Sequence, residues 1–280
     1  MMGLNNYING LVKMLNSTIS IVVFSKDRAC QLDLTLRSII KYMKLPFTLS
    51  TIYLSTSDEF NAGYEILKDL YKFEFIKQSN LKKDLLSVID TDLKYYFGMC
   101  DDTLLIRNLE YDTIFETFEN NQDIMTINLR LGKNVFHNYF EDTVKIQQPK
   151  FNKDNTYDWR SINNPHWNHP MTSYGHICRL DEIKSIVEMS EFENVNVLEN
   201  RIINLAKYKS LNICYDKHRT VELCANMVNT THLTNICGNI SIVDLNNRWL
   251  DGYRINLESL DYTIGNHQRF PNIEFKYYKR

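Results

Sequence analysis

The sequence has little glycine, little proline and no long apolar run. With 9 glycines and 5 prolines in 280 residues, it contains no collagen-like or low-complexity segment. No stretch reaches the roughly 20 uncharged apolar residues that cross a bilayer. Residues 1–24 also lack the basic start and compact apolar run of a signal peptide. The sequence therefore predicts neither a membrane span nor secretion.

An excess of charge is also absent. The 32 lysines and arginines nearly balance the 34 aspartates and glutamates, so no basic surplus is available for nucleic-acid phosphates, and we expect no nucleic-acid partner. The 12% of aromatic residues excludes a disordered chain and suits a large core. The 6 cysteines form no CxxC pair or Cys/His cluster, which favours reduced, mostly buried thiols in a cytoplasmic protein over a zinc site. Nothing in the composition indicates an oligomeric state.

The first hundred residues alternate short apolar runs with helical patterns. Strands are predicted at 18–24, 51–55, 73–76 and 95–99, and helices at 32–40, 64–71 and 81–89. Such alternation is typical of βαβ units with right-handed crossovers. We therefore predict an α/β, Rossmann-like fold with a mostly parallel central sheet flanked by helices. No glycine-rich fingerprint marks a dinucleotide or P-loop site.

The pattern is less regular beyond residue 107. It predicts helices at 112–120, 180–189, 197–208 and 243–250, and a strand at 123–129. The long polar stretch 134–171, rich in Asn, His and Trp, is typical of a substrate site or lid. No linker or internal repeat divides the chain, so we predict one domain over residues 1–280.

An acidic pair, Asp101 and Asp102, follows directly on a predicted buried strand. Ligands of open parallel sheets bind at the carboxyl ends of the strands. Two carboxylates there can hold a divalent cation that in turn takes phosphate oxygens. The alternative is a solvated pair that caps the next turn.

The segments around this pair resemble GT-A fold, family 2-like glycosyltransferases. The resemblance begins with IVVFSKDRACQLDLTLRSI, LKKDLLSVI and YYFGMCDDTLLI, which match that family's first strand and helix, its lysine-led helix and its acidic DxD-type motif. Further segments resemble a bacterial subgroup in the same order: INLRLGKN, PMTSYGHICRLDEI, VNVLENRI, NRWLDGYRINL and the final NHQ. The matches span most of residues 21–268.

The resemblance implies a nucleotide-donor half over about 18–107 and an acceptor half with a C-terminal segment over about 108–280. By position in the family's motifs, the donor would be bound by Phe24, Ser25, Lys26, Arg28, Ser55, Lys83, Asp101 and Asp102. The metal, Mn²⁺ or Mg²⁺, would be held by Asp102 and Asp101, with His267 approaching from the C-terminal segment. Cys100 stands where the family often has an Asp, which removes one carboxylate. For Arg28, Ser55, Lys83 and His267, a capping, surface or structural role is the alternative.

Glu199 is the candidate catalytic base, because the matching segment supplies an acidic residue beneath the acceptor. It can equally be a Glu favoured in the first turn of a helix. The resemblance, together with the suitability of indole rings for stacking on sugars, assigns acceptor or sugar contacts to Arg130, Trp159, Trp167, Gly175 and His176. A buried ion pair is the alternative for Arg130, and anchoring of the long loop is the alternative for the two tryptophans. Tyr174 replaces the Asp of the family's DGH core.

The resemblance therefore implies a metal-dependent, inverting hexosyl- or N-acetylhexosaminyltransferase of polysaccharide biosynthesis. Its donor would be a nucleotide sugar, with UDP favoured, and its acceptor a glycan or a lipid-linked saccharide. The basic, aromatic end at Lys276, Tyr277, Tyr278, Lys279 and Arg280 can contact the inner face of a membrane or form a solvated tail. Two alternatives remain: a non-catalytic nucleotide- or glycan-binding protein, motivated by Cys100 and Tyr174, and a sugar nucleotidyltransferase, which would need a glycine-rich loop that SKDRACQ lacks.

Overall fold

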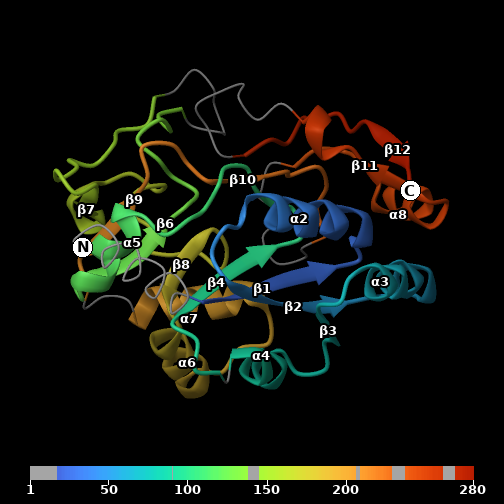
Figure 1. The fold of residues 1–280 in the computed structure, drawn as a ribbon, viewed down its shortest axis with the longest axis horizontal. Coiled ribbons are helices and arrows are strands. Elements are labelled where there is room, and N and C mark those ends of the chain that lie inside the picture. The colour runs from blue at the N-terminus through green and yellow to red at the C-terminus, as the bar shows by residue number, and fades with distance from the viewer. Residues whose placement is uncertain (1–17, 90, 138–144, 206–208, 229–236, 261–268) are drawn as a thin grey trace, which may run out of the picture.

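The computed structural model describes residues 18–89, 91–137, 145–205, 209–228, 237–260 and 269–280 (Figure 1). The strands are β1 (Ile19–Lys26), β2 (Phe47–Leu54), β3 (Glu74–Lys77), β4 (Tyr95–Cys100), β5 (Thr103–Leu105), β6 (Ile124–Asn128), β7 (Thr156–Asp158), β8 (His176–Arg179), β9 (Leu211–Cys214), β10 (Thr220–Glu222), β11 (Tyr253–Ile255) and β12 (Tyr277–Lys279). The α-helices are α2 (Ala29–Tyr42), α3 (Asp58–Leu70), α4 (Leu81–Ile89), α5 (Thr113–Asn120), α6 (Leu180–Met189), α7 (Val195–Leu205) and α8 (Ile242–Leu250), and short 3₁₀ helices lie at Trp159–Ser161 and Leu257–Ser259.

The central sheet has eight strands in the order β3-β2-β1-β4-β8-β6-β9-β7. Strands β3, β2, β1 and β4 are parallel to their neighbours, as are β6 and β9, whereas β8 runs antiparallel to both β4 and β6. The fold is thus α/β with a mostly parallel sheet, as predicted. Strand β8, and the edge strand β7, which is antiparallel to β9, are the exceptions that the sequence pattern did not indicate.

Alternate residues of β1 enter two different cores, because successive side chains of a strand point to opposite faces. Ile19, Ile21 and Val23 pack with α2, α3 and α8, whereas Val22 and Phe24 pack with α4, α6 and α7. Figure 1 shows these two groups of helices on opposite sides of the sheet. Burial on both faces explains why the β1 sequence reads as a continuous apolar run.

Most elements predicted from the sequence are confirmed, and α4 and α6 have the predicted bounds. The predicted helix at 64–71 begins earlier, at Asp58, because the Ser57 side chain accepts a hydrogen bond from the Phe60 N–H and caps the helix there. The short strands β5, β7, β9 and β10 were not predicted, since three or four residues are too few to show an alternating pattern.

The C-terminal residues fold back onto the protein. Strand β12 pairs with β11, and the Arg280 guanidinium lies 4.2 Å from the centre of the Trp249 ring. Residues 277–280 are therefore not a free tail, because they pack against α8 and β11, although Lys279 and Arg280 stay exposed to solvent. None of the helices that the structure describes is long and apolar enough to span a membrane. All six cysteines are free thiols, and four of them are buried.

Candidate active site

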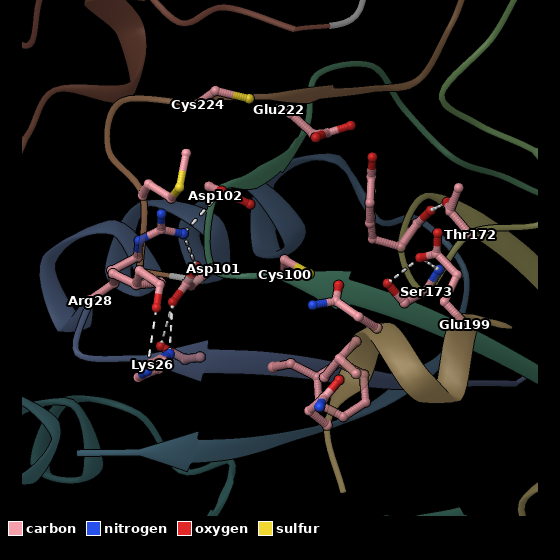
Figure 2. A pocket seen from close by; sticks show the side chains of 18 of the residues that line it. Lys26, Arg28, Cys100, Asp101, Asp102, Thr172, Ser173, Glu199, Glu222 and Cys224 are labelled. Atoms are coloured by element: carbon pink, nitrogen blue, oxygen red, sulfur yellow. Dashed lines mark hydrogen bonds and ion pairs between the residues drawn. The ribbon is translucent and has the colours of Figure 1, made fainter. Parts of the chain in front are cut away.

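A cavity of about 620 Å³ lies at the carboxyl ends of β1, β2 and β4. This is where the geometry of a parallel sheet places a ligand site, because the chain leaves each strand there and opens a crevice. Phe24 and Lys26 at the end of β1, Ile52 on β2, and Asp102 after β4 line one part of it. Residues of α7 and of the segments before β8 and after β10 line the rest. Figure 2 shows this arrangement, with the acidic pair and Glu199 on opposite sides.

Asp101 is buried and fully hydrogen-bonded. Its Oδ2 accepts hydrogen bonds from the Ser25 hydroxyl at 2.8 Å and from the Lys26 backbone N–H at 3.1 Å. Its Oδ1 accepts one from Arg28 Nη1 at 3.0 Å. Asp101 therefore ties the end of β4 to the end of β1 and to the turn that follows it.

The Arg28 guanidinium joins the two acids. The same Nη1 lies 3.0 Å from Asp102 Oδ2, and Nη2 donates to the Asn226 carbonyl at 2.6 Å. Burial raises the pKa values of Asp101 and Asp102, an effect that the nearby guanidinium opposes. Burial lowers the pKa of Arg28, but the two carboxylates outweigh it and hold that pKa above its usual value. The arginine is charged at any working pH.

The turn that carries Arg28 is held in an uncommon conformation. Asp27 has a φ of 55°, in the left-handed region that non-glycine residues rarely adopt. Its two carboxylate oxygens accept hydrogen bonds from the Thr56 N–H at 2.7 Å and the Thr56 hydroxyl at 2.8 Å. These bonds fix the turn against the end of β2 and direct Arg28 toward the acidic pair.

Glu199 lies across the cavity, in the first turns of α7. Its Oε2 accepts hydrogen bonds from the Ser173 N–H at 2.7 Å and the Ser173 hydroxyl at 2.8 Å, and its Oε1 lies 3.5 Å from His169 Nε2. Burial raises the pKa of Glu199, but the contacts with His169 and Ser173 outweigh it, so that this pKa lies below its usual value. Glu199 is therefore a carboxylate at neutral pH, with Oε2 anchored and Oε1 only loosely held.

A second basic group forms the wall between these two sides. Arg130 follows β6, is 8% exposed, and stacks on the Tyr174 ring at 5.0 Å. Glu222 at the end of β10 lies between Arg130 and Arg269: its Oε1 is 3.8 Å from Arg130 Nε, and its Oε2 accepts hydrogen bonds from the Arg269 guanidinium at 2.7 and 2.8 Å. Gly175, at a φ of 71°, leaves room for Arg130, because a Cβ there would lie 2.4 Å from Arg130 Cγ.

The cavity brings together eight of the residues singled out from the sequence: Phe24, Ser25, Lys26, Arg28, Asp101, Asp102, Arg130 and Glu199. It does not include Ser55, whose hydroxyl donates to Asn61, or Lys83, which is exposed on α4. His267 lies outside the described residues.

The three remaining side chains assigned to the sugar site do not line the cavity. Trp167 is fully buried among Phe151 and Tyr157, and the Trp159 indole N–H donates to the Lys209 carbonyl. His176 is buried beneath the loop before β8, and burial lowers its pKa to about 3. Both tryptophans therefore anchor loops, which was the alternative considered from the sequence.

Glu222, Arg269 and Ser173 were not predicted as site residues. Glu222 belongs to a three-residue strand, and Arg269 is distant from it in sequence, so no local pattern connects them. Ser173 lies within the PMTSYGH segment, and only the fold shows that its N–H meets Glu199. Arg269 follows directly on the NHQ segment, and this position next to a family-like motif was the only sequence signal that could have pointed to it.

The acidic pair does not present a ready site for a divalent metal. Both oxygens of Asp101 and one oxygen of Asp102 are bonded to protein donors. No group of three or more His, Cys, Asp or Glu side chains within the described ranges is placed to hold a metal ion. The Cys100 thiol adds no ligand charge, because burial raises its pKa well above the usual value. The expected Mn²⁺ or Mg²⁺ site stays a prediction that this arrangement does not favour.

Comparisons with known proteins connect the fold to sugar-transferring enzymes. No family model matches the chain. A Dictyostelium discoideum protein named bifunctional glycosyltransferase pgtA is 23% identical over 196 residues, which are 62% of this chain and 26% of that protein. The match thus spans about a quarter of the length of this relative.

Among solved structures, TarS 1-349 of S. aureus in complex with UDP-GlcNAc has a TM-score of 0.50 at 13% identity, covering 83% of this chain and 66% of that one. A cytidylyltransferase of Leptospira borgpetersenii has a TM-score of 0.43 at 14% identity, covering 83% of this chain and 94% of that one. At these identities the TarS likeness shows a shared α/β fold, and the weaker likeness adds nothing to the argument.

Proposed function

We propose that this protein transfers a sugar from a nucleotide-sugar donor to a hydroxyl group of an acceptor. One observation carries the proposal: a single cavity at the carboxyl ends of the parallel strands has a polar, charged wall on one side and an anchored carboxylate, Glu199, on the other. The pgtA relative, named a glycosyltransferase, and the TarS fold, solved with UDP-GlcNAc, support it.

The donor nucleotide is proposed to lie over the ends of β1 and β2. Phe24, Ile52 and Leu54 supply an apolar surface there, which suits the planar face of a base, and Gln78 supplies a polar group at its edge. UDP is the favoured nucleotide, because the TarS fragment of similar fold has been solved with UDP-GlcNAc. A hexose or an N-acetylhexosamine then extends toward Glu199.

Glu199 is proposed to act as the catalytic base. The acceptor oxygen attacks the anomeric carbon and gives its proton to Glu199, while the bond from that carbon to the diphosphate breaks. Attack from the side opposite the leaving group inverts the anomeric configuration. The Ser173 N–H and hydroxyl hold Oε2, so that Oε1 is the oxygen available to the acceptor.

The acceptor is proposed to be a glycan or a lipid-linked saccharide. The lipid-linked case requires the cavity to work beside a membrane, as a peripheral protein on its cytoplasmic face. The exposed cations Lys279 and Arg280 offer charge for contact with an anionic lipid surface.

Thermal unfolding with nucleotide sugars tests the proposal. We expect one of the UDP-, GDP-, dTDP- and CMP-linked sugars, with UDP favoured, to raise stability by about 2.7 kcal/mol at a hundredfold excess over its dissociation constant. Each is measured with Mn²⁺ and with EDTA. Stabilisation by a free nucleotide monophosphate alone, with nothing gained from a sugar, would instead support a non-catalytic nucleotide-binding protein. No stabilisation by any ligand would contradict the proposed function.

A further inference from the structure

The acidic pair is already occupied by a cation of the protein itself. Arg28 Nη1 lies 3.0 Å from an oxygen of Asp101 and 3.0 Å from an oxygen of Asp102, so it bridges the two carboxylates itself. Moving the guanidinium out would leave a buried charge without its partners, which is strongly unfavourable. Lys26, the other cation at this end of β1, donates its ammonium to the Val228 carbonyl at 3.3 Å. Each of these two cations is therefore bonded to oxygen atoms of the protein, although Arg28 Nε itself has no partner among the described residues.

The Arg130 guanidinium is buried and, in the described part of the chain, has only one long ion pair, with Glu222. The residue is more than nine-tenths buried and lines the cavity. Its Nε has no hydrogen-bond partner among the residues the structure describes, and the nearest carboxylate oxygen, Glu222 Oε1, is 3.8 Å away. Among the same residues, Glu222 Oε1 also has no hydrogen-bond partner, so the two groups form an ion pair that is too long for a hydrogen bond. Because buried charged donors are normally hydrogen-bonded and Arg130 lines the cavity, its guanidinium is a candidate partner for an acceptor group of a ligand.

The pairing of Arg130 with a carboxylate is also incomplete. Arg130 and Arg269 share a single carboxylate, Glu222, whose Oε2 is hydrogen-bonded to Arg269. Glu222 pairs with Thr103, the residue after the acidic pair, and so lies on the same side of the cavity as Asp102 (Figure 2). Arg130 thus shares its carboxylate with a second guanidinium that holds it more closely, whereas Arg28 faces two carboxylates. A planar guanidinium fork is well matched to two oxygens of a phosphate.

We propose that Arg130, supported by Arg269, binds the terminal phosphate of the nucleotide donor, and that donor binding requires no divalent cation at Asp101 and Asp102. This inference rests on the proposed function. In the transfer step, the bond between the anomeric carbon and the phosphate oxygen breaks, and its electron pair stays on that oxygen. Arg130 pairs with the resulting charge, while the acceptor proton goes to Glu199. The step needs no oxidant, reductant or further reactant.

Titration calorimetry of the full chain in EDTA tests the inference without relying on turnover. The probes are UDP and UMP, with GDP, GMP, dTDP and dTMP measured in the same way. We expect the preferred diphosphate to bind in EDTA and Mn²⁺ to change its dissociation constant less than threefold. Arg130→Gln should weaken diphosphate binding about 10- to 100-fold, the range for a lost hydrogen bond to a charged group, and leave monophosphate binding unchanged.

Two further variants keep the result interpretable. Arg160→Gln removes an exposed arginine far from the cavity and should leave binding unchanged. Arg130→Lys keeps the positive charge but loses the paired N–H donors of the guanidinium, so it should weaken diphosphate binding less than Arg130→Gln does. If the glutamine variant fails to fold, the lysine variant is used in its place.

Three outcomes overturn the inference. Diphosphate binding that appears only with Mn²⁺ restores the metal site and leaves the proposed function standing. Equal weakening of mono- and diphosphate by Arg130→Gln, or no weakening of either, removes Arg130 from the terminal phosphate. Absence of binding by every nucleotide, with and without Mn²⁺, overturns the proposed function and this inference together.

Discussion

The two acidic sides of the cavity use the same functional group in opposite ways. Asp101 accepts a hydrogen bond on each oxygen from Ser25, Lys26 or Arg28, and is thereby committed to holding two strands and a turn together. Glu199 has one oxygen anchored by Ser173, while the other has only the 3.5 Å contact with His169. The difference teaches that hydrogen-bond saturation, and not residue type, separates a structural carboxylate from one available for chemistry.

The largest expected effect concerns Glu199. Glu199→Gln removes the proton acceptor but keeps the shape of the side chain, so we expect kcat to fall about 10²- to 10⁴-fold, the usual contribution of a general base. The donor dissociation constant should stay nearly unchanged, as measured by calorimetry beside single-turnover kinetics. Glu188→Gln, at an exposed position of α6, is the matched control. Retained turnover, or an equal loss of donor binding, would show that Glu199 is not the base.

On the other side, Asp101→Asn should act on stability. Breaking a buried ion pair by removing one partner costs about 3–5 kcal/mol, and the remaining contact between Arg28 and Asp102 places the expected loss near 3 kcal/mol. Urea unfolding measures it, with Glu199→Gln expected to cost about 1 kcal/mol or less. A double-mutant cycle with Arg28→Met isolates the pair energy. If Asp101→Asn and Glu199→Gln lowered the free energy of unfolding by similar amounts, Asp101 would not be more structural than Glu199.

The smallest expected effect is the contribution of the buried His176 to the pH dependence of stability. Burial lowers the pKa of His176 to about 3, below the unfolded value near 6.5. Between these values the unfolded chain binds the additional proton, so the stability from a neutral His176 is complete above pH 6.5 and is lost as the pH falls. The loss approaches about 1.4 kcal/mol per pH unit.

Urea unfolding between pH 6.5 and 5 checks this sign. His176→Gln should remove that part of the slope, whatever it does to stability at pH 7. The partly exposed His137→Gln variant should leave the slope in place. Because burial also lowers the pKa of His166, to about 4, some slope remains in His176→Gln. An unchanged slope in that variant would mean that His176 can be protonated within the fold.

The regular half of the molecule was predictable because its signals are local. The β1 run, the stripes of α4 and α6, and the acids that follow β4 can each be recognised within a short window of sequence. The family resemblance singled out Glu199, and the structure places it on the lining of the same cavity as Asp102, while its role as the base stays a prediction. The fold and the candidate base could thus be predicted because their signals lie within short, continuous stretches of sequence.

The remaining features depend on contacts between distant segments. Glu222 and Arg269 lie 47 residues apart and meet through one isolated bridge, which no periodicity announces. Trp167 could not be assigned from its type, because an indole serves a sugar site and a loop anchor equally well, and here Tyr157 and Phe151 enclose it. The bond between Arg28 and Asp102 was likewise invisible, although both residues had been chosen.

Strand β8 acts as a spacer between the charged walls. It pairs on one side with β4, which leads into the acidic pair, and on the other with β6, which leads into Arg130. Two strand spacings, about 10 Å in all, therefore separate the backbones that carry these walls. The long segment between β6 and β8 can gain, lose or exchange residues without altering that interval. Under the proposed function, acceptor preference could thus change with the loops while the hydrogen-bond ladder keeps the distance between the walls constant.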